Sequence, residues 1–180
     1  MGELFSKAVK SLPKAELAQS FGEVAVKFLA DGMLGKLARW LRMLGQDVIY
    51  SVQFSDNELL ELTKAEERVL LTKDFELYKR AISRGLDSFY VEGETESARL
   101  AEVTKRYGLT LAVDMDKSHC PICNTKLAAT PKDQLKDELE QNTYTHYDKF
   151  WKCPNCGQVY WQGAHWKKIT NTLTLAQQET

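Results

Sequence analysis

The four cysteines of this 180-residue chain form two C-x-x-C pairs, and this spacing constrains the fold more than any other feature of the sequence. They are Cys120, Cys123, Cys153 and Cys156. Two intervening residues allow both thiolates of one tight turn to reach the same tetrahedral ion, and two such turns supply four ligands. The sequence therefore predicts one structural zinc ion, closed to water, in a small ribbon near the carboxy-terminal end.

Two other uses of the cysteines are open: four unrelated buried thiols, or a redox pair of the thioredoxin type. A redox site needs only one C-x-x-C at the start of a helix, whereas this chain has two pairs. His119 and His165 are further candidate ligands, but four thiolates already complete a tetrahedron. The first 25 residues lack the apolar core of a signal peptide, and no apolar run approaches the ~20 residues of a membrane helix. We therefore expect a cytoplasmic protein, in which thiols favour metal over disulfides.

Short apolar segments alternate with amphipathic segments ahead of the first cysteine. We expect strands at residues 24–30, 47–50, 68–72 and 88–91, and helices at residues 34–44, from residue 55, at 75–84 and at 95–107. Strands that alternate with helices of about ten residues indicate crossover connections and a parallel sheet flanked by helices. Residues 109–113 are a candidate edge strand, and residues 114–118 a linker.

This pattern divides the chain into an unassigned arm (1–23), an α/β domain (24–116), a zinc ribbon (117–170) and a tail (171–180). The net charge of −1 excludes a whole-surface attraction to nucleic acid, so any such contact must come from local patches. The ribbon is rich in aromatic residues, which are either its core or a stacking surface for bases. The sequence indicates no oligomeric state.

Three aspartates follow successive strands of the expected sheet. Asp31 follows the first strand, Asp56 opens the helix after the second, and Asp74 follows the third. Because the carboxyl ends of parallel strands meet at one edge, we expect these acids to lie there. Neighbouring carboxylates repel, and Mg²⁺ or Mn²⁺ with its oxygen ligands removes that repulsion. The pattern predicts a metal site at which activated water hydrolyses a phosphodiester.

Each of these acids also has a structural interpretation. Asp31 and Asp74 precede helices and are good helix caps. Ser55 and Glu58 fit a capping box, which we favour over a metal role for Glu58. A basic stripe on the first helix is either a solvated face or a guide that leads a phosphate backbone toward the acids.

Two sets of motifs resemble the PIN-like ribonucleases of the Mut-seven C-terminal domain (Mut7-C) family. They are residues 28–45, 55–58 and 70–74, then 120–124, 153–157 and 160–166. The resemblance covers residues 24–168 and implies a PIN-like α/β nuclease fold joined to a zinc ribbon. It also implies that RNA is the substrate, and it matches Asp31, Asp56 and Asp74 to the acidic metal-binding positions of the family.

The chain departs from the family pattern at two positions. Asn57 stands where many relatives carry a second acid, which leaves Glu58 as the candidate for a fourth acidic position. Lys73 stands where arginine is more usual, which keeps the charge but loses bidentate phosphate geometry. The residues expected to bind RNA phosphate are Lys36, Arg39, Arg42 and Lys73.

The leading prediction is therefore a metal-dependent ribonuclease with Zn²⁺ in the ribbon and Mg²⁺ or Mn²⁺ at the acids. The first alternative is an RNA-binding module that uses the ribbon and the basic helix face without cleaving RNA. A second alternative is a phosphoryl-accepting signalling domain, which also gathers acids at strand ends. Such a domain needs a pair of acids after its first strand, whereas Asp31 is followed by Gly32 and Met33.

Overall fold

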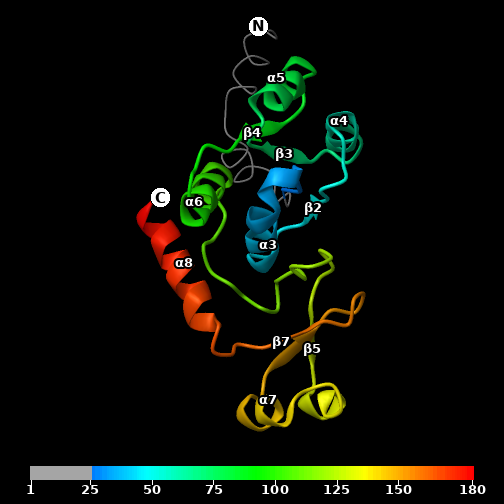
Figure 1. The fold of residues 1–180 in the computed structure, drawn as a ribbon, viewed down its shortest axis with the longest axis vertical. Helices are drawn as coiled ribbons and strands as arrows, with labels where there is room; N and C mark the ends of the chain where they lie inside the picture. Colours follow the sequence, from blue (N-terminus) through cyan, green and yellow to red (C-terminus); the bar gives the residue numbers. More distant parts are fainter. Residues whose placement is uncertain (1–25) are drawn as a thin grey trace, which may run out of the picture.

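A four-stranded parallel sheet forms the first part of the molecule, and a three-stranded antiparallel sheet forms the second (Figure 1). The structure is a computed structural model that describes residues 26–180, so the expected arm at residues 1–23 lies outside the described residues. The parallel strands are β1 (Phe28–Ala30), β2 (Val48–Tyr50), β3 (Val69–Thr72) and β4 (Ser88–Tyr90). Their order is β2-β1-β3-β4, which confirms the predicted α/β architecture.

The helices between these strands begin and end at the residues that cap them. They are α3 (Gly35–Met43), preceded by the 3₁₀ turn η1 (Gly32–Leu34), α4 (Asp56–Ala65), α5 (Phe75–Ser83) and α6 (Glu96–Tyr107). Ser55 and Glu58 form the expected capping box at the start of α4. Gly45 and Gly108 follow α3 and α6 with φ of 84° and 64°, a conformation that glycine adopts without strain.

The helices cover both faces of the parallel sheet, which is why its strands read as continuous apolar runs. Phe28 and Leu71 face α3 and α6, whereas Leu29 and Leu70 face α4 and α5. All four side chains are fully buried. Two apolar layers therefore hold the strands rigidly, and the loops at their ends are positioned by that core.

The second sheet consists of β5 (Ala128–Thr130), β6 (Phe150–Lys152) and β7 (Val159–Tyr160). The 3₁₀ turn η2 (Lys132–Leu135) and the short helix α7 (Gln141–His146) lie in the connection from β5 to β6. Its small core gathers Met115, Leu127 and Trp151 around the buried cysteines Cys120 and Cys153. Two of the four cysteines are thus part of the core of this lobe.

The last helix, α8 (Trp166–Gln178), corrects the expected carboxy-terminal organisation. The boundary expected between ribbon and tail at residue 170 falls inside this helix, which returns to α6 (Figure 1). Leu173 and Ala176 are buried in the core of the α/β domain, and Glu179 accepts a hydrogen bond from Ser97 (2.8 Å). The ribbon is therefore held between two segments that belong to the first domain.

The candidate edge strand at residues 109–113 is not formed. Leu109, Leu111 and Val113 pack against the core of the α/β domain, and Gln177 of α8 donates a hydrogen bond to the Leu111 carbonyl (3.1 Å). The apolar character of this segment thus reflects packing against helices rather than strand pairing. Within residues 26–180, no helix has the length and apolar character that crossing a membrane requires.

Candidate functional site

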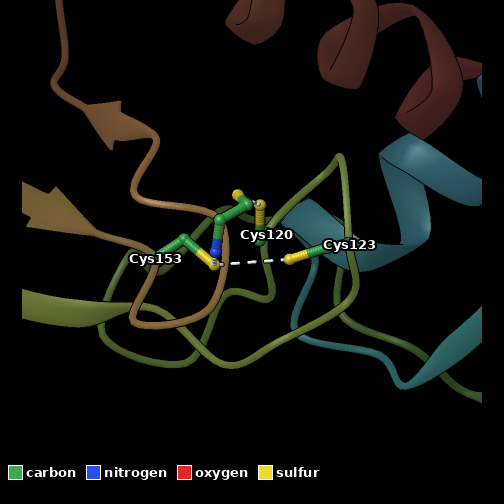
Figure 2. A group of neighbouring side chains, drawn as sticks. Cys120, Cys123 and Cys153 are labelled. Carbon is green, nitrogen blue, oxygen red and sulfur yellow. Dashed lines mark hydrogen bonds between the residues drawn. The ribbon is translucent and has the colours of Figure 1, made fainter.

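The four cysteine sulfurs converge on one point. All four Sγ atoms lie within 4.8 Å of one another, with 3.3 Å between Cys123 and Cys153 and 3.6 Å between Cys120 and Cys156. Figure 2 shows the sulfurs of Cys123 and Cys153 facing each other from different segments. These separations exceed the ~2.05 Å of a disulfide and approach the ~3.8 Å between sulfurs that surround a zinc ion at about 2.3 Å. The cysteines are therefore positioned to bind a metal, and the donor set suits zinc.

The two C-x-x-C turns have the same backbone geometry. The carbonyl oxygen of Cys120 accepts a hydrogen bond from the amide of Asn124 (2.9 Å), and the carbonyl oxygen of Cys153 accepts one from the amide of Gly157 (3.0 Å). Asn124 and Gly157 both have positive φ, of 67° and 76°, which closes each turn. Asparagine is one of the few residues besides glycine that adopts this conformation readily.

Tyr160 supports the cysteine site from β7. Its hydroxyl lies 3.1 Å from the sulfur of Cys120, the distance of a hydrogen bond donated to a thiolate. Burial and this hydrogen bond raise the pKa of Tyr160 above its usual value, so the hydroxyl keeps its proton. A donor to a ligating sulfur orients the ligand and stabilises its charge. His119 and His165 do not belong to the convergent group of donors.

Arg42 joins the first cysteine turn to the parallel sheet. Its Nε and Nη2 donate to the carbonyl of Val48 (2.9 and 2.7 Å), and its Nη1 donates to the carbonyls of Pro121 and Ile122 (2.9 and 3.1 Å). The side chain is buried, and burial lowers the pKa of Arg42 although the thiols of Cys120 and Cys123 oppose that shift. The expectation that Arg42 binds RNA phosphate is therefore wrong, because its guanidinium is used inside the protein.

A second polar link lies beside Arg42. Asn124 accepts a hydrogen bond from the Val48 amide (2.9 Å) and donates one to Asp47 (2.6 Å). Arg68 pairs with the same carboxylate through two nitrogens (3.0 and 3.2 Å). Burial favours a protonated Asp47, but the hydrogen bonds from Arg68 and Asn124 outweigh it and lower the pKa of that carboxyl. The cysteine turn thus contacts the amino-terminal edge of the sheet.

The predicted acids lie at the opposite, carboxyl edge, where one threonine connects two of them. Asp31 is buried and accepts hydrogen bonds from the Met33 amide (2.7 Å), the Lys73 amide (3.2 Å) and the Thr72 hydroxyl. The same Thr72 oxygen accepts a hydrogen bond from the Asp74 amide (2.8 Å). The Thr72 hydroxyl therefore links the Asp31 carboxylate to the backbone amide of Asp74.

The other acids have structural partners. Asp74 caps α5 by accepting from the amides of Glu76 and Leu77 (2.8 and 3.0 Å). Asp56 forms an ion pair with Arg80 of α5 (2.7 Å). Glu58 accepts hydrogen bonds from Ser55, and these lower the pKa of its carboxyl. Within residues 26–180, the four cysteines are the only group of three or more potential metal ligands whose donor atoms converge. The three aspartates therefore do not form such a group.

Two of the remaining basic candidates contact the β4–α6 loop or the start of α6. Lys36 pairs with Glu96 (2.7 Å), and the mostly buried Lys73 donates to the Gly93 carbonyl (3.2 Å). Arg39 is exposed on α3. The basic face that remains open to a ligand is therefore smaller than the sequence predicts.

The aromatic residues of the ribbon divide between its core and its surface. Phe150 and Trp151 are buried, and the indole nitrogen of Trp151 donates to Asp116 (2.7 Å). Tyr147 and Trp161 are half-buried with ring centroids 6.5 Å apart. Core packing therefore accounts for the two buried rings, whereas Tyr147 and Trp161 remain partly accessible.

The fold and the two sites define an α/β domain with an acidic sheet edge and an attached four-cysteine metal ribbon. The family model described as the Mut7-C RNAse domain matches residues 26–173, which is most of the chain. The chain belongs to this family, as its motifs predict. A search of curated proteins found no match. A search of solved structures also found none.

Proposed function

We propose that this protein is a metal-dependent ribonuclease that hydrolyses phosphodiester bonds of RNA at the carboxyl edge of its parallel sheet. The observation that supports the proposal is the Thr72 hydroxyl, which donates to the Asp31 carboxylate and accepts from the Asp74 amide, so that two acids follow neighbouring strands at one edge. Membership of the Mut7-C RNAse domain family supports RNA as the substrate.

Asp31 and Asp74 are the residues that would hold Mg²⁺ or Mn²⁺, and Asp56 joins them only if its carboxylate leaves Arg80. The bound ion would activate water and stabilise the leaving oxygen. Thr72 holds Asp31 in one orientation, and the exposed Arg39 attracts phosphate. The four thiolates hold Zn²⁺ in a closed structural site, with no position for water.

A second candidate function is an RNA-binding module without turnover. The observation that favours it is the occupation of the acids, since Asp31 accepts three hydrogen bonds, Asp74 caps a helix and Asp56 pairs with Arg80. Carboxylates used in this way are stable without a metal ion. The two functions differ in whether the protein cleaves the RNA that it binds.

Cleavage of labelled single-stranded RNA by the zinc-loaded chain, with Mn²⁺ or Mg²⁺ added, tests the proposal. We expect cleavage by the unsubstituted protein and its loss in the double variant Asp31→Asn, Asp74→Asn. Asp137→Asn changes an exposed acid of the ribbon and serves as the matched control, with full activity expected. Cleavage that survives in the double variant would identify a contaminating nuclease. Binding without cleavage by the unsubstituted protein would establish the binding module instead.

A further inference from the structure

Exposed apolar side chains gather at the same edge of the sheet as the acids. Of the six large hydrophobic residues that are exposed within residues 26–180, three lie within three residues of the ends of β1, β2 and β3. They are Met33, Val52 and Phe75, with exposed fractions of 67%, 71% and 52%. Exposed apolar patches that are rimmed by polar residues often mark ligand-binding or interaction sites. This edge therefore has the composition of a binding surface.

Phe75 is the aromatic member of this group, and two tyrosines fix its ring. Its centroid lies 5.5 Å from that of Tyr90 in an edge-to-face contact and 6.2 Å from that of Tyr78 in a stacked one. Tyr78 and Tyr90 are half-buried and lie 6.0 Å apart, so they form a support below the more exposed ring. Lys79 places its ammonium over the Phe75 ring, 5.1 Å from the centroid, so a base that stacks on that face displaces this flexible side chain. The cluster is an aromatic surface of three contacting rings with a positive charge over its most exposed ring.

The position of this cluster relative to the acids is set by the backbone. Asp74 is the cap of α5 and Phe75 is the first residue of that helix, so the carboxylate and the ring come from consecutive residues. Helix capping explains Asp74 but does not require an aromatic residue next to it. A packing role would bury the ring, yet about half of Phe75 remains exposed. The ring is thus available to a molecule that also reaches Asp74.

We propose that Phe75, supported by Tyr78 and Tyr90, stacks against an unpaired nucleobase of the RNA next to the phosphodiester at the acidic edge. The proposal rests on the ribonuclease function proposed above. Aromatic rings bind bases of any sequence through their π-faces. A base in a duplex is already stacked and paired and cannot cover the ring. The site therefore selects single-stranded RNA, with little preference for sequence.

Binding of RNA that carries the fluorescent base 2-aminopurine reports stacking directly. The measurement uses the zinc-loaded full chain carrying Asp31→Asn, so that the RNA stays intact. We expect quenching on binding and a loss of single-strand affinity of about fivefold or more for Phe75→Leu, which keeps the apolar volume but not the stacking face. Phe75→Trp is expected to retain both signals. Ile82→Leu changes an exposed apolar residue on the same helix and serves as the control.

Each result bears on one of the two proposals. Unchanged affinity and quenching in Phe75→Leu would overturn the stacking proposal. An equal loss of affinity in Ile82→Leu would also overturn it. Either result would favour a protein partner as the ligand of the apolar edge. Equal affinity for single-stranded and duplex RNA would also overturn the stacking proposal. If the chain without the Asp31→Asn change quenches the probe but does not cleave RNA, the ribonuclease proposal fails while the stacking site stands.

Discussion

Thr72 is the residue on which the geometry of the acidic edge depends most directly. Its hydroxyl donates to Asp31 and accepts from the Asp74 amide, so both acids lose a partner when it is removed. Thr72→Val keeps the shape of the side chain and removes only the hydroxyl. We predict a loss of about 1–3 kcal/mol in unfolding free energy and a large loss of cleavage rate, both restored by Thr72→Ser.

Urea unfolding and the initial rate of RNA cleavage measure these two effects. If Thr72→Val cleaves RNA at the same rate as the unsubstituted protein, the shared hydroxyl does not position the acids.

Arg80 controls the third acid, because it pairs with Asp56 (2.7 Å) and also donates to Asn57 (2.7 Å). Replacing Arg80 with glutamine removes the charge that competes with a metal ion for Asp56. We predict that Arg80→Gln reaches half-maximal cleavage at a lower Mn²⁺ concentration than the unsubstituted protein. Arg84→Gln, at the C-cap of the same helix, is the control, because the contact of Arg84 with Glu61 is longer at 3.7 Å. A higher Mn²⁺ requirement in Arg80→Gln would argue that Asp56 is not a ligand.

Residue types and spacing predicted the cysteine site and the capping box but misassigned Arg42. The stripe of Lys36, Arg39 and Arg42 looks continuous, yet six residues rotate about 600° around a helix, which places Arg42 about 120° from Lys36. That rotation carries Arg42 onto the buried side, where three carbonyls need donors. Those carbonyls come from segments far apart in the chain, so the sequence gives no signal for them.

At the scale of elements, α3 connects the two sites. It follows Asp31 and η1 at one end, and at its other end the carbonyls of Arg42 and Met43 accept hydrogen bonds from the His119 amide (2.8 Å) and the Ser118 hydroxyl (2.6 Å). The nine residues of the helix span about 14 Å. The helix therefore separates the cysteine turn from the acids and fixes the distance between them.

Replacing Arg42 tests this connection. Arg42→Met keeps the aliphatic length but leaves the carbonyls of Val48, Pro121 and Ile122 without their donor. We predict a loss of about 3 kcal/mol in the free energy of unfolding, measured with urea, whereas Arg39→Met on the exposed face changes it little. Equal stability of the two variants would show that the ribbon does not depend on this contact.

The polar link at the start of β2 should make stability depend on acidic pH. The pKa of Asp47 is lowered in the folded state, so its contribution is complete above the unfolded pKa of about 4 and is lost as pH falls below it. We predict that the stability difference between the unsubstituted protein and Asp47→Asn is constant near neutral pH and shrinks as the pH falls below about 4. Chemical unfolding at several pH values measures it. A difference that does not change with pH would contradict the role of the Asp47 charge.

Glycines and caps made most elements predictable, because Gly45, Gly85 and Gly108 end helices with positive φ. Helix α8 was not among the expected helices, and its threonines are weak helix formers. Its apolar residues Ile169, Leu173 and Ala176 follow helical spacing and pack against the first domain, so the signal was present. The segment 109–113 shows the opposite error, because an apolar run alone does not specify strand pairing.

At the scale of the whole molecule, the ribbon and the α/β domain form one connected unit. The first cysteine turn contacts the start of β2, and α8 leads from the ribbon back to α6 (Figure 1). A metal that binds only the folded state stabilises everything that unfolds with its ligands. We predict that chelation, or Cys153→Ser, lowers the thermal midpoint of a single transition that includes the helices of the α/β domain. Circular dichroism during heating measures this, and an unchanged helical transition in the metal-free protein would contradict it.

The central claim is that the acids at the carboxyl edge bind a catalytic divalent ion far from the cysteine site. Anomalous scattering from a crystal of the zinc-loaded protein soaked with Mn²⁺ tests this claim most directly. We predict a manganese peak between Asp31 and Asp74, with Asp56 turned from Arg80, and a separate zinc peak among the four sulfurs. A zinc peak with no manganese density at Asp31, Asp56 or Asp74 would contradict the account.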